Sequence, residues 1–133
     1  MQHFIGMCGR YHWLAERDTP DCIHRNSYTA FVHQHQLGKI YHCIGVVDDF
    51  LVLQAKRSTS FKVKAVHFQP LAASAFYMGD AVRVLNGSLQ DQMAVIQGIG
   101  WHSKHQKLIF ILYAQHKRCS RWYFAEDIAP AFV

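Results

Sequence analysis

The chain has 133 residues, half of them hydrophobic and 17% charged, which supports a packed core and excludes a disordered charged tail. A chain of this length forms one compact domain or two very small ones. Fourteen lysine and arginine residues against nine acidic residues give a net charge of +5. This positive charge favours an acidic partner, either nucleic acid or the acidic surface of a protein.

The compartment is inferred from the N-terminus, the apolar runs and the cysteines. No run of about 18 apolar residues is present, so the sequence predicts no transmembrane helix and no membrane partner. Met1 to Gly6 lack the basic region that opens a secretory signal. Four scattered cysteines, without a Cys-x-x-Cys pair, are typical of free thiols in a reducing compartment: Cys8, Cys22, Cys43 and Cys119. We therefore expect a cytoplasmic protein.

Residues 1–37 are expected to form an N-terminal segment with one helix. Thr19 and Pro20 resemble an N-cap and a first helical residue, and Gly38 suits a C-terminal stop. The helix is predicted between residues 20 and 37.

Residues 38–70 change to a period of two, which is typical of strands. Strands are predicted over 39–47, 50–54 and 61–66, with turns at Asp48-Asp49 and at 56–60. Three strands cannot bury both faces alone, so this smaller β unit needs the flanking segments.

Residues 71–133 are expected to form a larger β unit. Strands are predicted over 79–85, 93–101, 108–114 and 119–124, followed by a 3₁₀ turn and a last short strand within 125–130. The nearly all-apolar strand 108–114 is typical of burial on both faces. The predicted core consists of seven residues: Val82, Val84, Val95, Ile99, Phe110, Leu112 and Tyr123.

Residues 76–130 resemble bacterial SH3-like (KOW/Tudor-like) domains in Phe76, Gly79-Asp80-x-Val82, Gly98-Ile99-Gly100-Trp101-His102, Lys104 and Ser120-Arg121-Trp122-Tyr123. Residues 38–70 resemble a second, weaker unit through Gly38-Lys39-Ile40-Tyr41 and Asp49-Phe50-Leu51. The two unit starts are Gly38 and Gly79, and this spacing indicates an internal repeat. The resemblance implies a mainly β fold with one N-terminal helix and SH3-like small barrels, as two units packed together. It also implies a binding module, since some such bacterial domains are similar to immunity proteins that block a toxin.

Metal binding is an alternative that the ten histidines raise. Four residues could ligate zinc: Cys8, His12, Cys22 and His24. Their spacing does not match the usual cysteine pairs. His33 and His35 on a helix would point about 200° apart and could not share an ion. His102 and His105 lie in a predicted loop without a third ligand nearby in sequence. We therefore expect neither a metal nor another cofactor.

Catalysis is the other alternative, in the form of a small cysteine- or metal-dependent enzyme. A Cys8–His12 dyad has no orienting carboxylate or amide close in sequence. No Gly-x-Ser-x-Gly, His-Glu-x-x-His or phosphate-binding loop is present. The sequence therefore favours a protein that is not an enzyme, with no catalytic residues.

A basic and aromatic surface is predicted on the loops 102–107 and 116–122. Its residues are Lys104, His105, Lys107, Lys117, Arg118, Arg121 and Trp122. We expect these loops at one end of the barrel, where their side chains project together. Basic groups beside aromatic rings suit single-stranded nucleic acid, whereas Trp and Arg also predominate at protein interfaces.

The family resemblance favours the protein interface. The expected function is non-enzymatic docking and inhibition of an acidic partner, a toxin or effector, in a bacterium or phage. Nucleic-acid binding by an SH3/KOW-like module is the alternative. If Trp122 were buried in the barrel core, it would not be available to contact either kind of partner.

Overall fold

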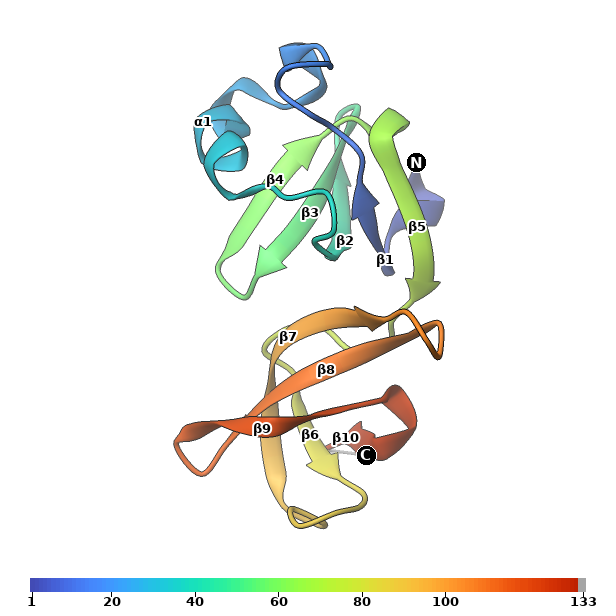
Figure 1. The fold of residues 1–133 in the computed structure, drawn as a ribbon, viewed down its shortest axis with the longest axis vertical. Helices are drawn as coiled ribbons and strands as arrows, with labels where there is room; N and C mark the ends of the chain where they lie inside the picture. Colours follow the sequence, from blue (N-terminus) through green and yellow to red (C-terminus); the bar gives the residue numbers. More distant parts are fainter. Residues whose placement is uncertain (132–133) are drawn as a thin grey trace. The chain divides into compact units, whose positions relative to one another are not determined.

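The computed structural model describes residues 1–131 and divides the chain into two compact units, Met1–Ser74 and Ala75–Val133. Each unit contains one five-stranded antiparallel sheet, and the described α-helix belongs to the first unit (Figure 1). The prediction of a mainly β protein with one N-terminal helix is therefore confirmed. Neither sheet closes into a barrel, because no described ladder joins its two end strands.

Unit 1 has the strand order β4-β3-β2-β1-β5. Its elements are η1 (Gln2–Phe4), β1 (Met7–Tyr11), η2 (Pro20–Cys22), α1 (Arg25–Gln34), β2 (Tyr41–Val47), β3 (Phe50–Lys56), β4 (Thr59–Val63), η3 (Ala65–His67) and β5 (Phe68–Ala73). The predicted meander of three strands corresponds to β2, β3 and β4.

Unit 2 has the strand order β10-β6-β7-β8-β9. Its elements are β6 (Ala81–Val84), β7 (Met93–His102), β8 (Lys107–Ala114), β9 (Lys117–Tyr123), η4 (Ala125–Asp127) and β10 (Ile128–Pro130). The predicted strands, the 3₁₀ turn and the last short strand are all present, because alternation and turn residues mark each of them locally.

The first domain boundary differs from the prediction. We expected residues 1–37 to stand apart from 38–70, and the larger unit to begin at residue 71. Instead β1 lies between β2 and β5 in one sheet, with Cys8 opposite both His42 and Ala72. Residues 1–37 are therefore an integral part of unit 1, which extends to Ser74 because β5 is its last strand.

The repeat has a different spacing from the predicted one. In chain order, both sheets place the first strand between the second and the fifth, and a 3₁₀ turn precedes the fifth. Aligning these turns pairs Ala65 with Ala125 and Pro70 with Pro130. The predicted alignment of Gly38 with Gly79 was wrong, because Gly38 precedes the second strand of its unit and Gly79 precedes the first strand of the other.

The helix is shorter than predicted and begins later. Thr19 and Pro20 start η2, as N-cap and first residue, but the chain is extended again at Ile23. His24 then caps α1, since its Nδ1 accepts a hydrogen bond from the Asn26 N–H at 3.1 Å.

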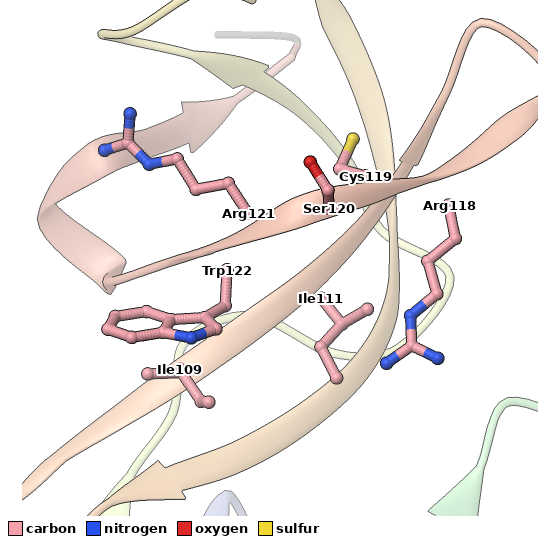
Figure 2. A pocket seen from close by; sticks show the side chains of 7 residues that line it. All are labelled: Ile109, Ile111, Arg118, Cys119, Ser120, Arg121 and Trp122. Atoms are coloured by element: carbon pink, nitrogen blue, oxygen red, sulfur yellow. The ribbon is translucent and has the colours of Figure 1, made fainter.

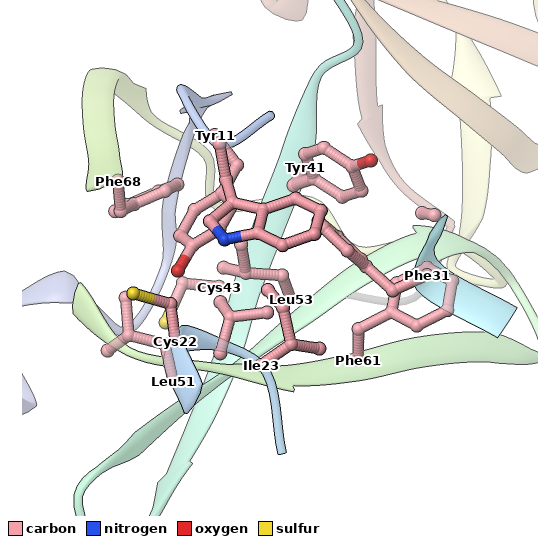
Figure 3. Close-up of a cluster of buried hydrophobic side chains, with 13 residues drawn as sticks. Tyr11, Cys22, Ile23, Phe31, Tyr41, Cys43, Leu51, Leu53, Phe61 and Phe68 are labelled. Atoms are coloured by element: carbon pink, nitrogen blue, oxygen red, sulfur yellow. The ribbon is translucent and has the colours of Figure 1, made fainter. Parts of the chain in front are cut away.

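The core of unit 1 is an aromatic and aliphatic cluster to which most elements of the unit contribute (Figure 3). The Phe31 ring of α1 lies at its centre, with ring centroids 5.7 Å from Tyr11 and 5.1 Å from Phe61. Trp13 and Tyr41 are also buried there. Segment 12–40 therefore supplies part of the core and is not a surface loop.

The core of unit 2 matches the prediction except at one position. Six predicted residues are buried: Val82, Val84, Ile99, Phe110, Leu112 and Tyr123. Val95 is only half-buried, and its neighbour Ile96 is fully buried. A β-bulge between Ile96 and Gly98 reverses the alternation, so residues on either side of it cannot share the predicted phase.

His35 is held in one tautomer beside the unit 1 core. Its Nε2 lies 2.9 Å from the Trp13 carbonyl oxygen, and its Nδ1 lies 2.7 Å from the Tyr41 hydroxyl. A carbonyl only accepts, so Nε2 carries the proton and the Tyr41 hydroxyl donates to Nδ1. Burial lowers the pKa of His35 below its usual 6.5.

We expect unit 1 to lose stability as the pH falls below about 6.5, because His35 of the unfolded chain binds a proton before folded His35 does. Above that pH both states are neutral and the contribution is constant. The substitution His35→Gln should reduce this slope in urea unfolding measured from about pH 8 to 5, whereas His33→Gln, at an exposed neighbour, should not. Equal slopes in the two variants would contradict the assignment.

Candidate functional site

The predicted basic residues occupy two ends of one strand instead of a single end. His102 pairs with Lys107 at the start of β8, and Ala114 pairs with Lys117 at its end. Successive hairpins of a meander turn at opposite ends, so the turns 103–106 and 115–116 are separated by the length of β8, about 23 Å. The prediction that the two loops project together was therefore wrong.

The β7–β8 turn carries a cluster of rings. His102 stacks on His105 with centroids 4.6 Å apart, and Trp122 approaches His102 to 5.0 Å. Phe124 contacts all three rings at 5.4 to 5.8 Å. Trp122, near the end of β9, thus lies close to the β7–β8 turn. Lys117 and Arg118, at the start of β9, lie near the opposite end of β8.

Lys107 is neutralised within this cluster. Its Nζ lies 2.9 Å from Glu126 Oε1 and 5.2 Å from the centroid of the Phe124 ring. Lys107 therefore contributes less free charge to a partner than the sequence indicated, whereas Lys104 has no described carboxylate partner.

The outer face of β8 and β9 is apolar. Ile109 and Ile111 are half-buried, and Trp122, which pairs with Ile111, is 43% exposed. These three side chains and Arg118 point to one side of the sheet, whereas Cys119, Ser120 and Arg121 point away from them (Figure 2). All seven residues line a hollow of about 360 Å³, which we call the β8–β9 groove.

Two glycines of β7 leave space for the isoleucines of the groove. A Cβ atom on Gly100 would lie 3.2 Å from Ile109 Cγ1, and one on Gly98 would lie 3.4 Å from Ile111 Cδ1. The side chains of both isoleucines therefore pack directly against the backbone of β7 at these glycines.

The apolar outer face was misassigned from the sequence. The continuous apolar run 108–114 predicted burial on both faces, yet Tyr113 is 39% exposed. A continuous apolar run fits two arrangements: a strand buried on both faces, or a strand with one face in the core and the other on an apolar surface. The sequence therefore did contain a sign of the apolar outer face.

The carboxylates of unit 2 are used within the unit. Asp91 lies 3.4 Å from Arg83, and Glu126 pairs with Lys107. Asp80 accepts the Tyr77 N–H at 2.8 Å, and Asp127 accepts the Asn86 side-chain N–H at 2.8 Å and the Phe124 backbone N–H at 3.0 Å. Among residues 75–131, four basic side chains have no described ion-pair partner, so their charge is available to another molecule: Lys104, Lys117, Arg118 and Arg121.

Arg121 is held in place by its own unit. It donates to Asn86 Oδ1 at 3.1 Å, and its guanidinium lies 4.8 Å from the centroid of the Tyr123 ring. It also lies over Gly87, where a side chain would collide with it and where φ is +81°. The guanidinium is exposed but fixed, with further N–H donors free to bind a carboxylate.

The residues weighed as zinc ligands are engaged separately. His12 Nε2 lies 2.6 Å from Gln69 Oε1, and the His24 ring packs edge-on against Phe50. Burial, with a smaller contribution from Cys43, raises the pKa of the Cys8 thiol to about 12. No group of three or more His, Cys, Asp or Glu side chains suited to a metal ion occurs among the described residues.

Comparison with known proteins identifies a family but no function. None of the helices described over residues 1–131 is both long and apolar enough to cross a bilayer. No curated protein and no solved structure matches the chain. One family model matches residues 1–129, nearly the whole chain, and its description is "Family of unknown function (DUF6960)". The chain, with its two sheets and its β8–β9 groove, therefore belongs to the DUF6960 family.

Proposed function

We propose that this chain is a non-enzymatic binding protein that docks an acidic surface of a partner protein through unit 2. The observation that carries the proposal is the β8–β9 groove, in which Ile109, Ile111 and Trp122 lie beside Arg118. A hydrophobic centre with an unneutralised cation at its rim is the composition of a protein interface.

The arrangement of charge favours a protein over a nucleic acid. A nucleic acid needs a continuous row of cations along its phosphates. Here the free cations Lys104 and Lys117 lie at opposite ends of β8, and the apolar pair Ile109 and Ile111 lies between them. A partner with an apolar centre and acidic flanks satisfies this pattern better than a phosphate backbone does.

The proposed kind of fold also favours a binding module. We propose that both units are SH3-like, on the basis of their shared strand order and of the 3₁₀ turn before each last strand. The inhibitor or immunity role, with a toxin or effector as partner, follows from the family resemblance stated for residues 76–130.

The burial of the Cys8 thiol disfavours the Cys8–His12 dyad that was considered as a catalytic alternative. The raised pKa of Cys8 keeps its thiol protonated near neutral pH, where a nucleophile must be a thiolate. Three of the four cysteines are buried and all four are unpaired, which agrees with the reducing cytoplasm that the proposal includes.

Reversing the charge at the groove should weaken partner binding. We expect the double variant Lys117→Glu/Arg118→Glu to lose about 1–2 kcal/mol of affinity, because an acidic partner would then face two carboxylates. The matched control, Lys56→Glu/Arg57→Glu, makes the same charge change on the exposed β3–β4 turn and should bind normally. The measurement is titration calorimetry with the protein that co-purifies with the tagged chain.

Unfolding of both variants should match the wild type, since exposed charges contribute little to stability. Unchanged affinity of the groove variant would place the interface elsewhere, with the helix from His24 to His35 as the next surface to test. A shift of generic oligonucleotides that weakens steeply with salt would favour the nucleic-acid alternative.

A further inference from the structure

In unit 1, the C-terminal end of the outer edge of strand β4 is covered by the protein's own chain. Ile23 forms an antiparallel bridge with Val63. The His24 N–H donates to the Lys62 carbonyl at 2.9 Å, and the Lys64 N–H donates to the Cys22 carbonyl at 2.7 Å. The segment around Ile23 therefore extends the sheet beyond its last strand.

The same segment is anchored from the helix and the core. Ser27 Oγ of α1 accepts the Lys62 N–H at 3.1 Å, and Ile23 and Cys22 are both buried. Figure 1 shows α1 beside β4. The C-terminal end of the β4 edge is thus hydrogen-bonded at Lys62 and Lys64 by residues from the long segment 12–40. The Phe61 ring of β4 also packs against Phe31 of this segment.

The corresponding strand of unit 2 is β9. The alignment that matches the two 3₁₀ turns also matches Val63 with Tyr123, and both are buried. Val63 pairs with the buried Leu51, as Tyr123 pairs with the buried Phe110. The two edge strands therefore end in corresponding residues, Val63 and Tyr123, that are both buried.

Within residues 1–131, no segment is hydrogen-bonded to the outer edge of β9 as the Ile23 segment is to β4. Its described pairing partner is β8, and it ends the sheet. The long segment of unit 1 corresponds to residues 85–92, which connect β6 to β7 directly and contain no helix. Near the middle of β9, residues 119–121 lie opposite Leu112 alone, so a bulge displaces this backbone from β8.

A hollow lies on each side of the exposed strand. On one side is the apolar β8–β9 groove with Ile109, Ile111 and Trp122. The other hollow, of about 170 Å³, includes Lys117, Arg121, Gln115 and Ser88 and is more polar. Both hollows share Cys119, Ser120 and Arg121 of β9. Since successive side chains of a strand point to opposite faces, one strand laid along β9 would place its side chains in both hollows alternately.

We propose that the β9 edge accepts an extended segment of the partner protein, which pairs with β9 as the Ile23 segment pairs with β4. This inference rests on the proposed function and specifies its partner. The segment alternates apolar residues, which enter the β8–β9 groove, with acidic residues, which face Lys117 and Arg121. Main-chain hydrogen bonds along the edge supply affinity, and the two hollows supply specificity.

The positive charge of β9 disfavours a second copy of this chain as the occupant, and a hydrogen bond at Phe124 limits how far along β9 a partner strand can pair. A second copy of this chain carries +5 and is repelled by the cations of β9, which are a known protection of edge strands against self-association. The N–H of Phe124, which corresponds to that of Lys64, already donates to Asp127 at 3.0 Å. Pairing therefore ends within β9 and does not reach η4.

The test uses the full chain and three synthetic peptides, followed by fluorescence anisotropy. The first peptide alternates glutamate with valine, the second has the same sequence with alternate backbone nitrogens methylated, and the third replaces glutamate by lysine. We expect the first to bind and to protect the amides of residues 117–122 from hydrogen exchange. Methylation removes main-chain donors, so the second should bind at least about tenfold more weakly. The third should not bind.

The variants separate this inference from the proposed function. The substitutions Lys117→Glu/Arg118→Glu should weaken the first peptide at least about tenfold, whereas Lys56→Glu/Arg57→Glu should not. Equal binding of the methylated peptide, or protection outside β9, would overturn strand addition and leave surface docking standing. Absence of binding by the first peptide would also overturn it. Binding that is indifferent to the Lys117 and Arg118 reversals would overturn the proposed function itself.

Discussion

The substitution Gly9→Ala should destabilise unit 1 by about 3 kcal/mol. Gly9 lies on the interior strand β1 at a register shift, opposite Pro70 of β5. A Cβ atom there would lie 2.8 Å from the Pro70 Cα and closer still to the Gln69 carbonyl oxygen. These are backbone atoms, so no side chain can rotate away and the β1–β5 ladder must separate.

The measurement is urea unfolding together with hydrogen exchange of the β1 and β5 amides. Gly45→Ala is the matched control, because Gly45 lies in neighbouring strand β2 and a Cβ atom there meets nothing within 4 Å. It should change the free energy of unfolding by less than about 0.5 kcal/mol. Equal effects of the two substitutions would show that β1 and β5 do not approach as closely as the structure indicates.

Phe31→Ala should cost about 3–5 kcal/mol, as expected for removing a fully buried aromatic side chain. The Phe31 ring stacks on His35 at 4.5 Å and contacts Trp13 at 5.8 Å, besides Tyr11 and Phe61. It is the buried residue of α1, so its loss should release the helix from the sheet.

Release of α1 would also uncover the β4 edge. Because Ser27 and His24 bond Lys62, the amides of Lys62 and Lys64 should lose protection from hydrogen exchange in the Phe31 variant. Val32→Ala, at the next and 38% exposed position, should leave both stability and protection nearly unchanged. Retained protection at Lys62 would show that the edge is covered independently of the helix.

The contrast between the two units gives the binding proposal its specificity. Unit 1 uses a long segment between its first two strands to complete its core and to cover β4, and unit 2 has a short connection at the same place. An uncovered edge strand is normally a liability in a folded protein. In unit 2 this edge lies beside an apolar groove and has cations at both of its faces, as the proposed binding of an acidic segment requires.

The strands and the 3₁₀ turn of unit 2 were predictable from the sequence alone. Each of β7, β8 and β9 is marked by its own β-branched and aromatic residues and by polar turns, and the core positions Phe110 and Leu112 follow from a period of two. These features depend on residues close together in the chain. The same holds for the meander of β2, β3 and β4, since each hairpin closes locally.

Strands β1 and β5 were missed because their pairing is non-local. Tyr11 pairs with Phe68, far along the chain, and β1 is a short strand with a glycine at its centre. No local pattern distinguishes such a segment from a loop. The error in the domain boundary followed directly, because β1 is the strand that joins residues 1–37 to the rest of unit 1.

The residues of the candidate site could be predicted from the sequence, but their positions relative to one another could not, because these depend on the fold. Basic and aromatic residues from 104 to 122 could be named from composition, but their positions at two ends of β8 depend on strand direction and register. The neutralisation of Lys107 by Glu126, and the difference between the covered β4 edge and the open β9 edge, depend on contacts between distant segments. Local periodicity indicates which face of a strand is apolar. Which backbone edge lacks a pairing strand, and which charged side chain lacks an ion-pair partner, depends on how distant segments come together in the sheet.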